Sequence, residues 1–343
     1  MWYILSKIKE KLSLSILIAM VIGLIVGYFV NTSFLNNLII PLTILMVFPM
    51  MVNLDFSMLF KKGDTKILVL AQLINFIFIP LLAFAIGSLF FKSQPYVFIG
   101  FMIMAVLPTS GMTISWTGFT KGNINAAVKI TIMGLILGAI IGPFILDLVF
   151  GQSVTIPALK IIRQILIVVL IPMLIGITTK KIMLKKIGQV KYNMKWKKRF
   201  PLLSSIGIIL VIFIATSLKA KTIIQDPMTV LFLVVPIIIF YVTNFTVTTV
   251  IGHYFCKNNN RSALVYGTVM RNLSVALAIS MTAFDTGNSS IALIIAISYI
   301  FQVQFAALYI RVFKKITHKL LLIFSDVQAL TVRRAVVGSL IVP

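Results

Sequence analysis

Ten apolar segments of roughly 18–25 residues recur along this chain and restrict it to one broad class of fold. Each is long enough to cross the ~30 Å hydrocarbon core of a bilayer as an α-helix. The chain is 60% hydrophobic and only 11% charged, unlike a soluble globular domain. We therefore predict an all-α polytopic membrane protein with about ten transmembrane helices. The predicted spans are residues 13–31, 35–54, 66–91, 96–119, 125–150, 160–179, 201–218, 227–253, 262–284 and 290–312.

The cations of the chain predict how it lies in the membrane. If the N-terminus is inside, 24 of the 31 Lys and Arg residues fall on the cytoplasmic side and five on the outer side. The positive-inside rule then predicts a multi-pass protein of the cell membrane with both termini cytoplasmic. A net charge of +24 would suggest nucleic-acid binding in a soluble protein. Here the loops explain the charge, so we expect no nucleic-acid partner, although binding by residues 180–199 is the alternative.

Catalytic and metal-binding functions find little support in the sequence. Cys256 is the only cysteine of the chain, which excludes an internal disulfide and a Cys-rich metal cluster. No span carries two carboxylates or a convincing pair of histidines, which an intramembrane enzyme would need. We expect no enzymatic activity, no bound metal and no cofactor.

The segment 180–200 is the longest polar stretch, and it separates two parts of the chain. Residues 1–179 hold a first five-helix repeat and the start of the second, 180–200 form a basic cytoplasmic loop, 201–319 hold the last four helices, and 320–343 form a cytoplasmic tail. Pro80 and Gly111 in the first half correspond to Pro236 and Gly267 in the second. Five helices per repeat force the two repeats to be inverted. Inverted repeats with interrupted helices at matching positions are typical of secondary transporters, although this weak similarity could also be chance.

The fourth span contains a sequence that disrupts a helix. Pro108 removes a helical hydrogen bond and Gly111 loosens the turn, so we expect the helix to break there. The freed amides and the hydroxyls of Thr109, Ser110 and Thr113 could hold a polar substrate or ion. The alternative is a simple proline kink.

Two cations lie within apolar spans. Arg271 is ~13 Å from the start of the ninth span, near the bilayer midplane, where an arginine costs at least ~2.5–3.5 kcal/mol. Lys129 is only ~6–8 Å deep, so its side chain could also extend to the interface. Neither stretch contains an acidic residue near these cations. We therefore expect the counter-ion to come from outside the chain, as a transported anion, or the charges to replace a bound metal cation.

Four motifs carry a resemblance to a known family. They are PMMVNLDF at 49–56, PTSG at 108–111, TKGN at 120–123 and MRNLSVALA at 270–278. Together they resemble the bile acid:sodium symporter superfamily, which includes arsenite permeases, and the first motif is similar to the arsenite-permease branch. The resemblance covers residues 10–313. It implies a core domain and a panel domain, with the fourth and ninth helices crossing where they unwind.

In the sodium-coupled branch, the crossing region holds a Ser-Asn pair in the fourth helix and a Ser and a Thr in the fifth. By position, Thr113 stands for the first Ser and Ile114 for the Asn. Ala127 stands for the second Ser, while Thr131 keeps the Thr. The resemblance therefore implies that several oxygen ligands for Na⁺ are missing from this chain.

The ninth helix of that branch carries Glu, Gln and Asn. Gly267 stands where the Glu would be and Arg271 where the Gln would be, while Asn272 is retained. Hard cations need several oxygen ligands, and Arg271 would repel one. Arsenite permeases carry a Cys in the fourth helix, where this chain has Thr109 or Ser110, so the thiol expected for a soft substrate is absent.

These observations predict a secondary transporter that moves an arsenite-type oxyanion or another small anion without Na⁺. Its driving force would be the membrane potential or protons, with Lys129 as a candidate proton carrier. A sodium-coupled organic-anion symporter and a passive anion channel are the alternatives. The predicted substrate-binding residues are Arg271, Asn272, Thr109, Ser110, Thr113, Lys129, Thr131, Gln72 and Asn75, with Gln72 and Asn75 contributed by the third helix.

Overall fold

The computed structural model describes residues 5–7, 10–150, 167, 171–218, 220–225, 227–284 and 290–310. The described elements are α-helices with short 3₁₀ and π segments. Five described helices are long and apolar enough to cross a membrane, and four shorter apolar helices accompany them. The count of ten spans and the inverted repeat stay predictions, as does the division of the chain into segments. Much of the predicted sixth span and the whole tail 320–343 lie outside the described residues.

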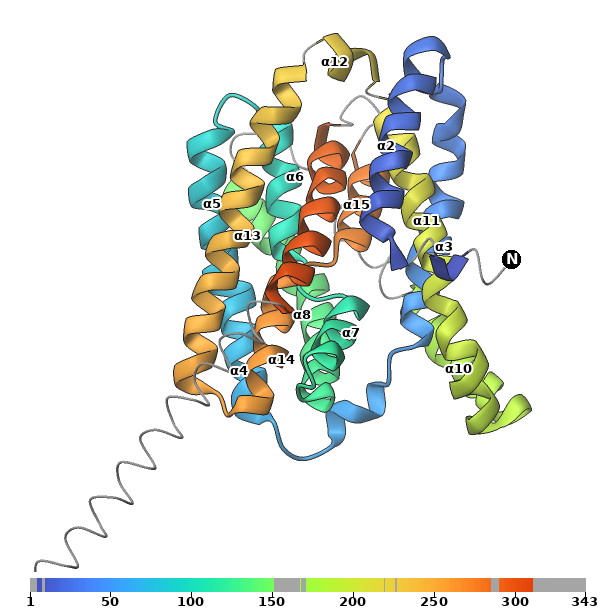
Figure 1. Cartoon of the computed structure of the whole chain (residues 1–343), viewed down its shortest axis with the longest axis vertical. Helices are drawn as coiled ribbons and strands as arrows, with labels where there is room; N and C mark the ends of the chain where they lie inside the picture. Colours follow the sequence, from blue (N-terminus) through green and yellow to red (C-terminus); the bar gives the residue numbers. More distant parts are fainter. Residues whose placement is uncertain are drawn as a thin grey trace, which may run out of the picture.

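Four helices form one bundle, on the right of Figure 1. Small residues let them approach closely, as is usual between membrane helices. A Cβ at Gly207 would lie 2.7 Å from the backbone nitrogen of Met46, and one at Gly176 would lie 2.9 Å from the backbone of Met51. The bundle consists of α2 (Leu12–Phe29), α3 (Ile39–Val52), α10 (Ile171–Lys191) and α11 (Lys197–Leu218).

The remaining long helices form a second bundle, on the left of Figure 1. The third helix of the chain contains a π segment, a distortion that is frequent at functional sites. This helix consists of α4 (Thr65–Leu73), the π segment η3 (Ile74–Phe78) and α5 (Ile79–Phe90). The bundle also contains α8 (Ile124–Phe150), α13 (Pro227–Phe255) and the helix Ser290–Ile310. The resemblance implies a core domain and a panel domain, and we expect the two bundles to correspond to them.

Two helices of the second bundle are interrupted in mid-course. The fourth consists of α6 (Pro95–Val106) and α7 (Gly111–Phe119), and the ninth of α14 (Asn258–Val269) and α15 (Leu273–Thr282). The two interruptions meet: Pro108 and Arg271 form an isolated antiparallel bridge. The amide of Asn272 also donates to the carbonyl of Leu107 at 2.9 Å. The break in the fourth helix lies where Pro108 and Gly111 predicted it, and the break in the ninth helix is of the kind that the resemblance implies.

Candidate functional site

The interruption of the fourth helix is held against α8. Thr109 has φ 59°, in the left-handed region that few non-glycine residues adopt. Its hydroxyl lies 2.8 Å from the carbonyl of Pro108 and 3.1 Å from that of Thr131. Two glycines of α8 make room, since a Cβ at Gly134 would lie 2.9 Å from Thr109 Oγ1 and one at Gly138 2.8 Å from Pro108 Cδ. Close packing against α8 therefore stabilises a backbone conformation that is otherwise unfavourable.

Helix α7 begins with a capping box. The hydroxyl of Ser110 accepts from the amide of Met112 at 3.2 Å, and Thr113 Oγ1 accepts from the amide of Ser110 at 3.4 Å. Thr113 also donates to the carbonyl of Tyr266 at 3.1 Å, which ties α7 to α14. The N-terminus of α7 is thereby fixed beside the crossing point.

Helix α15 begins with a side-chain cap at Asn272, whose Oδ1 accepts from the amide of Val275 at 3.2 Å. The amides of a first helical turn have no partner within the helix, and the helix dipole makes that end positive. Both α7 and α15 start at the crossing, so two such positive ends lie close together there.

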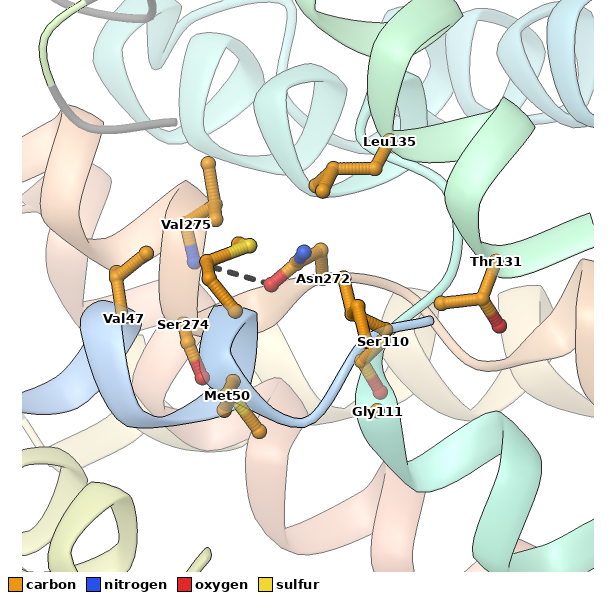
Figure 2. Close-up of a pocket in the computed structure, with 11 residues that line it drawn as sticks. Val47, Met50, Ser110, Gly111, Thr131, Leu135, Asn272, Ser274 and Val275 are labelled. Carbon is orange, nitrogen blue, oxygen red and sulfur yellow. Dashed lines mark hydrogen bonds between the residues drawn. The ribbon is translucent and has the colours of Figure 1, made fainter. Parts of the chain in front are cut away.

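A small pocket lies at these two helix starts (Figure 2). It has room for about one water molecule. A Cβ added at Gly111 would meet no atom within 4 Å, so the backbone there borders open space. The polar lining is Ser110, Gly111, Thr131, Asn272 and Ser274, and the apolar lining is Val47, Met50, Met51, Leu54, Leu135 and Val275. The pocket therefore lies between α3 of the first bundle and the crossing helices of the second.

Arg271 lies behind the crossing and is not among the residues that line this pocket. Its side chain is fully buried. Nη1 donates to Asn75 Oδ1 at 2.7 Å and to the carbonyl of Thr268 at 2.9 Å. Nη2 donates to the carbonyl of Ala105, and Nε lies 3.5 Å from the carbonyl of Met104. The acceptors are all neutral, and three of them are carbonyls in the last turns of α6 and α14.

This arrangement corrects the expectation that a counter-ion for Arg271 must come from outside the chain. The C-terminal end of a helix carries partial negative charge on its unpaired carbonyls. Because α6 and α14 both end beside Arg271, the guanidinium neutralises two helix ends with one charge. Its burial is thus stabilised by dipoles rather than by a carboxylate.

Gln302 fixes the backbone of Arg271 and was not among the predicted site residues. Its Oε1 accepts from the Arg271 amide at 2.7 Å, and its Nε2 donates to the Arg271 carbonyl at 3.2 Å. Tyr241 of α13 donates to the same Oε1 at 3.2 Å. A glutamine in an apolar span is a signal for such an interhelical bond, but the sequence does not identify its partner.

Asn75 and Gln72 lie on the third helix, and neither lines the pocket of Figure 2. Asn75 is fully buried at the π segment, accepts from Arg271, and donates to the carbonyl of Gly267 at 3.0 Å. Gln72 Nε2 lies 3.5 Å from the carbonyl of Ile130. Asn75 therefore stabilises the side chain of Arg271 and is not part of the pocket lining.

Lys129 has a counter-ion within the chain, contrary to the sequence-based expectation. Its Nζ lies 3.3 Å from Asp64 Oδ2 and donates to the carbonyl of Gly63 at 2.8 Å. Asp64 also accepts from Asn123 at 2.9 Å. Lys129 is buried but does not line the pocket. Asp64 was missed because it precedes the third span instead of lying inside one.

Comparisons with known proteins place the chain in a family and identify relatives. The model of the Sodium Bile acid symporter family matches residues 40–226. The uncharacterized protein YbaS of Bacillus subtilis is 24% identical over 71% of this chain and 77% of its own length. The arsenical-resistance protein Acr3 of Corynebacterium glutamicum is 24% identical over 82% of each chain. Acr3 of Alkaliphilus metalliredigens is 23% identical over 58% of this chain and 60% of its own length.

The matched region begins at the start of α3 and ends just before α13, so it includes the interrupted fourth helix and the α3 wall of the pocket. Likeness to two Acr3 proteins is consistent with the arsenite-permease-like branch. The chain belongs to the sodium bile acid symporter family and is a membrane transporter of the bile acid symporter and arsenite permease superfamily.

Proposed function

We propose that this protein is a secondary transporter that moves a small anion through the pocket of Figure 2, by alternating access and without Na⁺. One observation carries the proposal. Of the four half-helix ends at the crossing, the C-terminal ends of α6 and α14 are occupied by Arg271, while the N-terminal ends of α7 and α15 border the pocket.

Helix dipoles make this pocket favourable for an anion. Helix N-termini bind anions through their free amides and positive ends. The hydroxyls of Ser110 and Ser274 and the side-chain amide group of Asn272 add hydrogen-bond donors at the same place. Because Arg271 cancels the negative ends of α6 and α14, these ends do not oppose an anion in the pocket. A cation entering the pocket would be repelled by the positive helix ends.

Transport without Na⁺ is supported by a shortage of free oxygen ligands near the crossing. Arg271 engages Asn75 and the carbonyls that would otherwise be free to coordinate a cation. A Cβ at Gly267 would lie 2.8 Å from Ile130, so a carboxylate has no room there without repacking. Ile114 and Ala127 provide no side-chain oxygen. Too few oxygen ligands remain for a hard cation, so the driving force is the membrane potential or a proton.

The position of the pocket supports alternating access. One wall belongs to α3 in the first bundle and the other to the crossing helices in the second. Movement of one bundle against the other would open the pocket to either side in turn, as in transporters built from inverted repeats. The pocket has room for about one water molecule, so it is closed rather than a continuous pore. A closed pocket favours a carrier over a passive channel.

We propose an arsenite-type oxyanion as the substrate, supported by the likeness to the two Acr3 proteins. Hydroxyls and amides would hold it as an oxy-species, since Cys256 lies at the end of α13 and does not line the pocket. The second candidate is a small organic anion, favoured by the apolar wall of Val47, Met50 and Leu54, against which a hydrocarbon part could pack.

We further propose that both termini are cytoplasmic and that the protein resides in the cell membrane. The segment before α4, the turn after α7 and the start of α14 meet at one end of the molecule, since Asn123 donates to Asp64 and to Asn260, each at 2.9 Å. The end of α10 lies at this same lower end in Figure 1. These segments carry many of the cations that the positive-inside rule assigns to the cytoplasm.

The experiment is counterflow in proteoliposomes preloaded with arsenite, antimonite or a small carboxylate, one at a time. We expect saturable uptake of the labelled anion, accelerated by the same anion inside and unchanged when choline replaces Na⁺. Uptake that never saturates and shows no counterflow would identify a channel instead, and uptake restored only by Na⁺ would identify a sodium symporter.

A further inference from the structure

Residues 180–199, here called the basic loop, contain nine Lys and Arg residues and no Asp or Glu. The loop has a defined path. Helix α10 is kinked at Gly188, where φ is 76°, and the chain then continues through a π segment, η5 (Tyr192–Trp196), into α11. The loop is thus a compact helical projection from the first bundle, visible at the lower right of Figure 1.

The end of this projection is apolar. Val190 and Met194 are each 72% exposed. They line an open hollow together with Ile187, Lys191 and Lys195. Exposed apolar side chains ringed by lysines are typical of segments that lie in the headgroup region of a bilayer, with the apolar groups reaching the acyl chains and the cations reaching phosphates.

Aromatic residues hold the projection against the end of α3. Trp196 stacks with the guanidinium of Arg199, whose Cζ lies 5.4 Å from the ring centroid. The hydroxyl of Tyr192 donates to the carbonyl of Val52 at 3.2 Å. Burial, and then the charge of Asp55, raise the pKa of Tyr192 to about 12, so it stays a neutral donor at ordinary pH. Tryptophan and tyrosine are enriched at membrane–water interfaces.

From this combination we infer that the basic loop binds anionic phospholipids, with Val190 and Met194 inserted between them and the lysines on their phosphates. The inference relies on the proposed orientation, which puts the loop at the anionic cytoplasmic leaflet, and not on the identity of the substrate. Charge complementarity selects the occupant, because the lysines gain little electrostatic attraction from zwitterionic lipid.

The loop is also joined to the wall of the pocket. Lys180 donates to the carbonyl of Leu54 at 3.1 Å and lies 3.6 Å from Asp55 Oδ2. Leu54 lines the pocket, and Tyr192 contacts Val52 two residues earlier. The loop that binds lipid therefore contacts the end of α3. We expect anionic lipid to change the transport rate in addition to binding the loop.

Quenching of Trp196 by brominated lipids in nanodiscs tests the inference without any substrate. The signal of Trp196 is the difference between the natural protein and a Trp196→Phe variant, which removes the background of the other two tryptophans. In ~0.15 M salt, we expect brominated phosphatidylglycerol to quench Trp196 at a roughly tenfold lower lipid fraction than brominated phosphatidylcholine. Equal quenching by the two lipids would overturn the inference.

A matched pair of variants identifies the residues responsible. Glutamine at Lys185, Lys186, Lys191 and Lys195 should remove the preference for phosphatidylglycerol. Glutamine at Lys61, Lys62, Lys66 and Lys121, exposed lysines at the same end of the molecule, removes as much charge and should leave the preference intact. Equal losses in both variants would contradict a specific site. Displacement of phosphatidylglycerol by RNA at this salt would assign the loop to nucleic acid and also overturn the inference.

Discussion

Arg271 donates from Nη1 to Oδ1 of Asn75 at 2.7 Å, joining the crossing of the fourth and ninth helices to the π segment of the third. Asn75 in turn donates to the carbonyl of Gly267. The charge of Arg271 is therefore held by the fold itself and is fixed one layer behind the pocket. Its effect on an anion would be exerted through the electrostatic potential and through the helix ends that it stabilises.

Substituting Arg271 tests this role. Arg271→Gln leaves the carbonyls of Thr268, Ala105 and Met104 without their cation, so we expect a loss of about 2–4 kcal/mol in stability and at least a roughly tenfold loss of transport. Arg271→Lys keeps the charge and should keep part of the activity. Thermal stability by fluorescence-detected chromatography, with flux measured on the folded fraction, checks both. A folded Arg271→Gln variant with normal flux would show that the charge is purely structural.

Two buried asparagines provide a matched comparison. Asn75→Leu removes the acceptor of Arg271 and should cost about 1–3 kcal/mol, because a buried charged donor loses its partner. Asn244 of α13 is equally buried, but its side-chain amide has no hydrogen-bond partner among the described residues. Asn244→Leu should therefore be neutral or stabilising. Equal destabilisation of the two variants in a thermal melt would remove the special role given to Asn75.

Lys129 and Asp64 should behave as a structural pair at the end of the second bundle. We expect Lys129→Gln to cost about 1–2 kcal/mol, because Asp64 remains partly solvated, and to leave at least half of the transport. The double variant with Asp64→Asn should recover part of the loss in a double-mutant cycle. Abolished flux in folded Lys129→Gln, with a flattened pH profile, would instead make Lys129 the carrier of a coupled proton.

Gly111 borders the pocket, and space is open beyond it. Gly111→Val should fold normally but place methyl groups where an anion would bind the start of α7, so we expect flux near background. Gly134→Val is the contrasting variant, since its Cβ would lie 2.9 Å from Thr109 Oγ1 and should destabilise the protein. If Gly111→Val folded and transported at the natural rate, the substrate would have to pass elsewhere.

Local sequence signals predicted part of this site. Pro108 and Gly111 predicted the interruption of the fourth helix, because proline and glycine weaken a helix whatever surrounds them. The midplane position of Arg271 likewise predicted that its side chain faces protein, water or a ligand rather than lipid. Both features depend on residues close together in the sequence, and the structure contains both.

The partners of the two buried cations could not be predicted in this way. Asp64 is 65 residues from Lys129, and Asn75 is 196 residues from Arg271. Such pairs form only after helices have packed, and a single sequence does not show which helices meet. The pocket wall on α3 was missed for a related reason, since Val47 and Met50 are apolar residues that look the same in a sequence whether they face lipid or substrate.

The most direct measurement is anion counterflow in proteoliposomes at equal ionic strength with Na⁺ or with choline, at a fixed membrane potential. Because Arg271 takes the carbonyls and the amide oxygen that a cation would need, we expect the two initial rates to agree within about twofold, with saturation in both buffers. A rate that falls to the level of empty liposomes in choline, and returns in proportion to added Na⁺, would contradict the proposed sodium-independent anion transport.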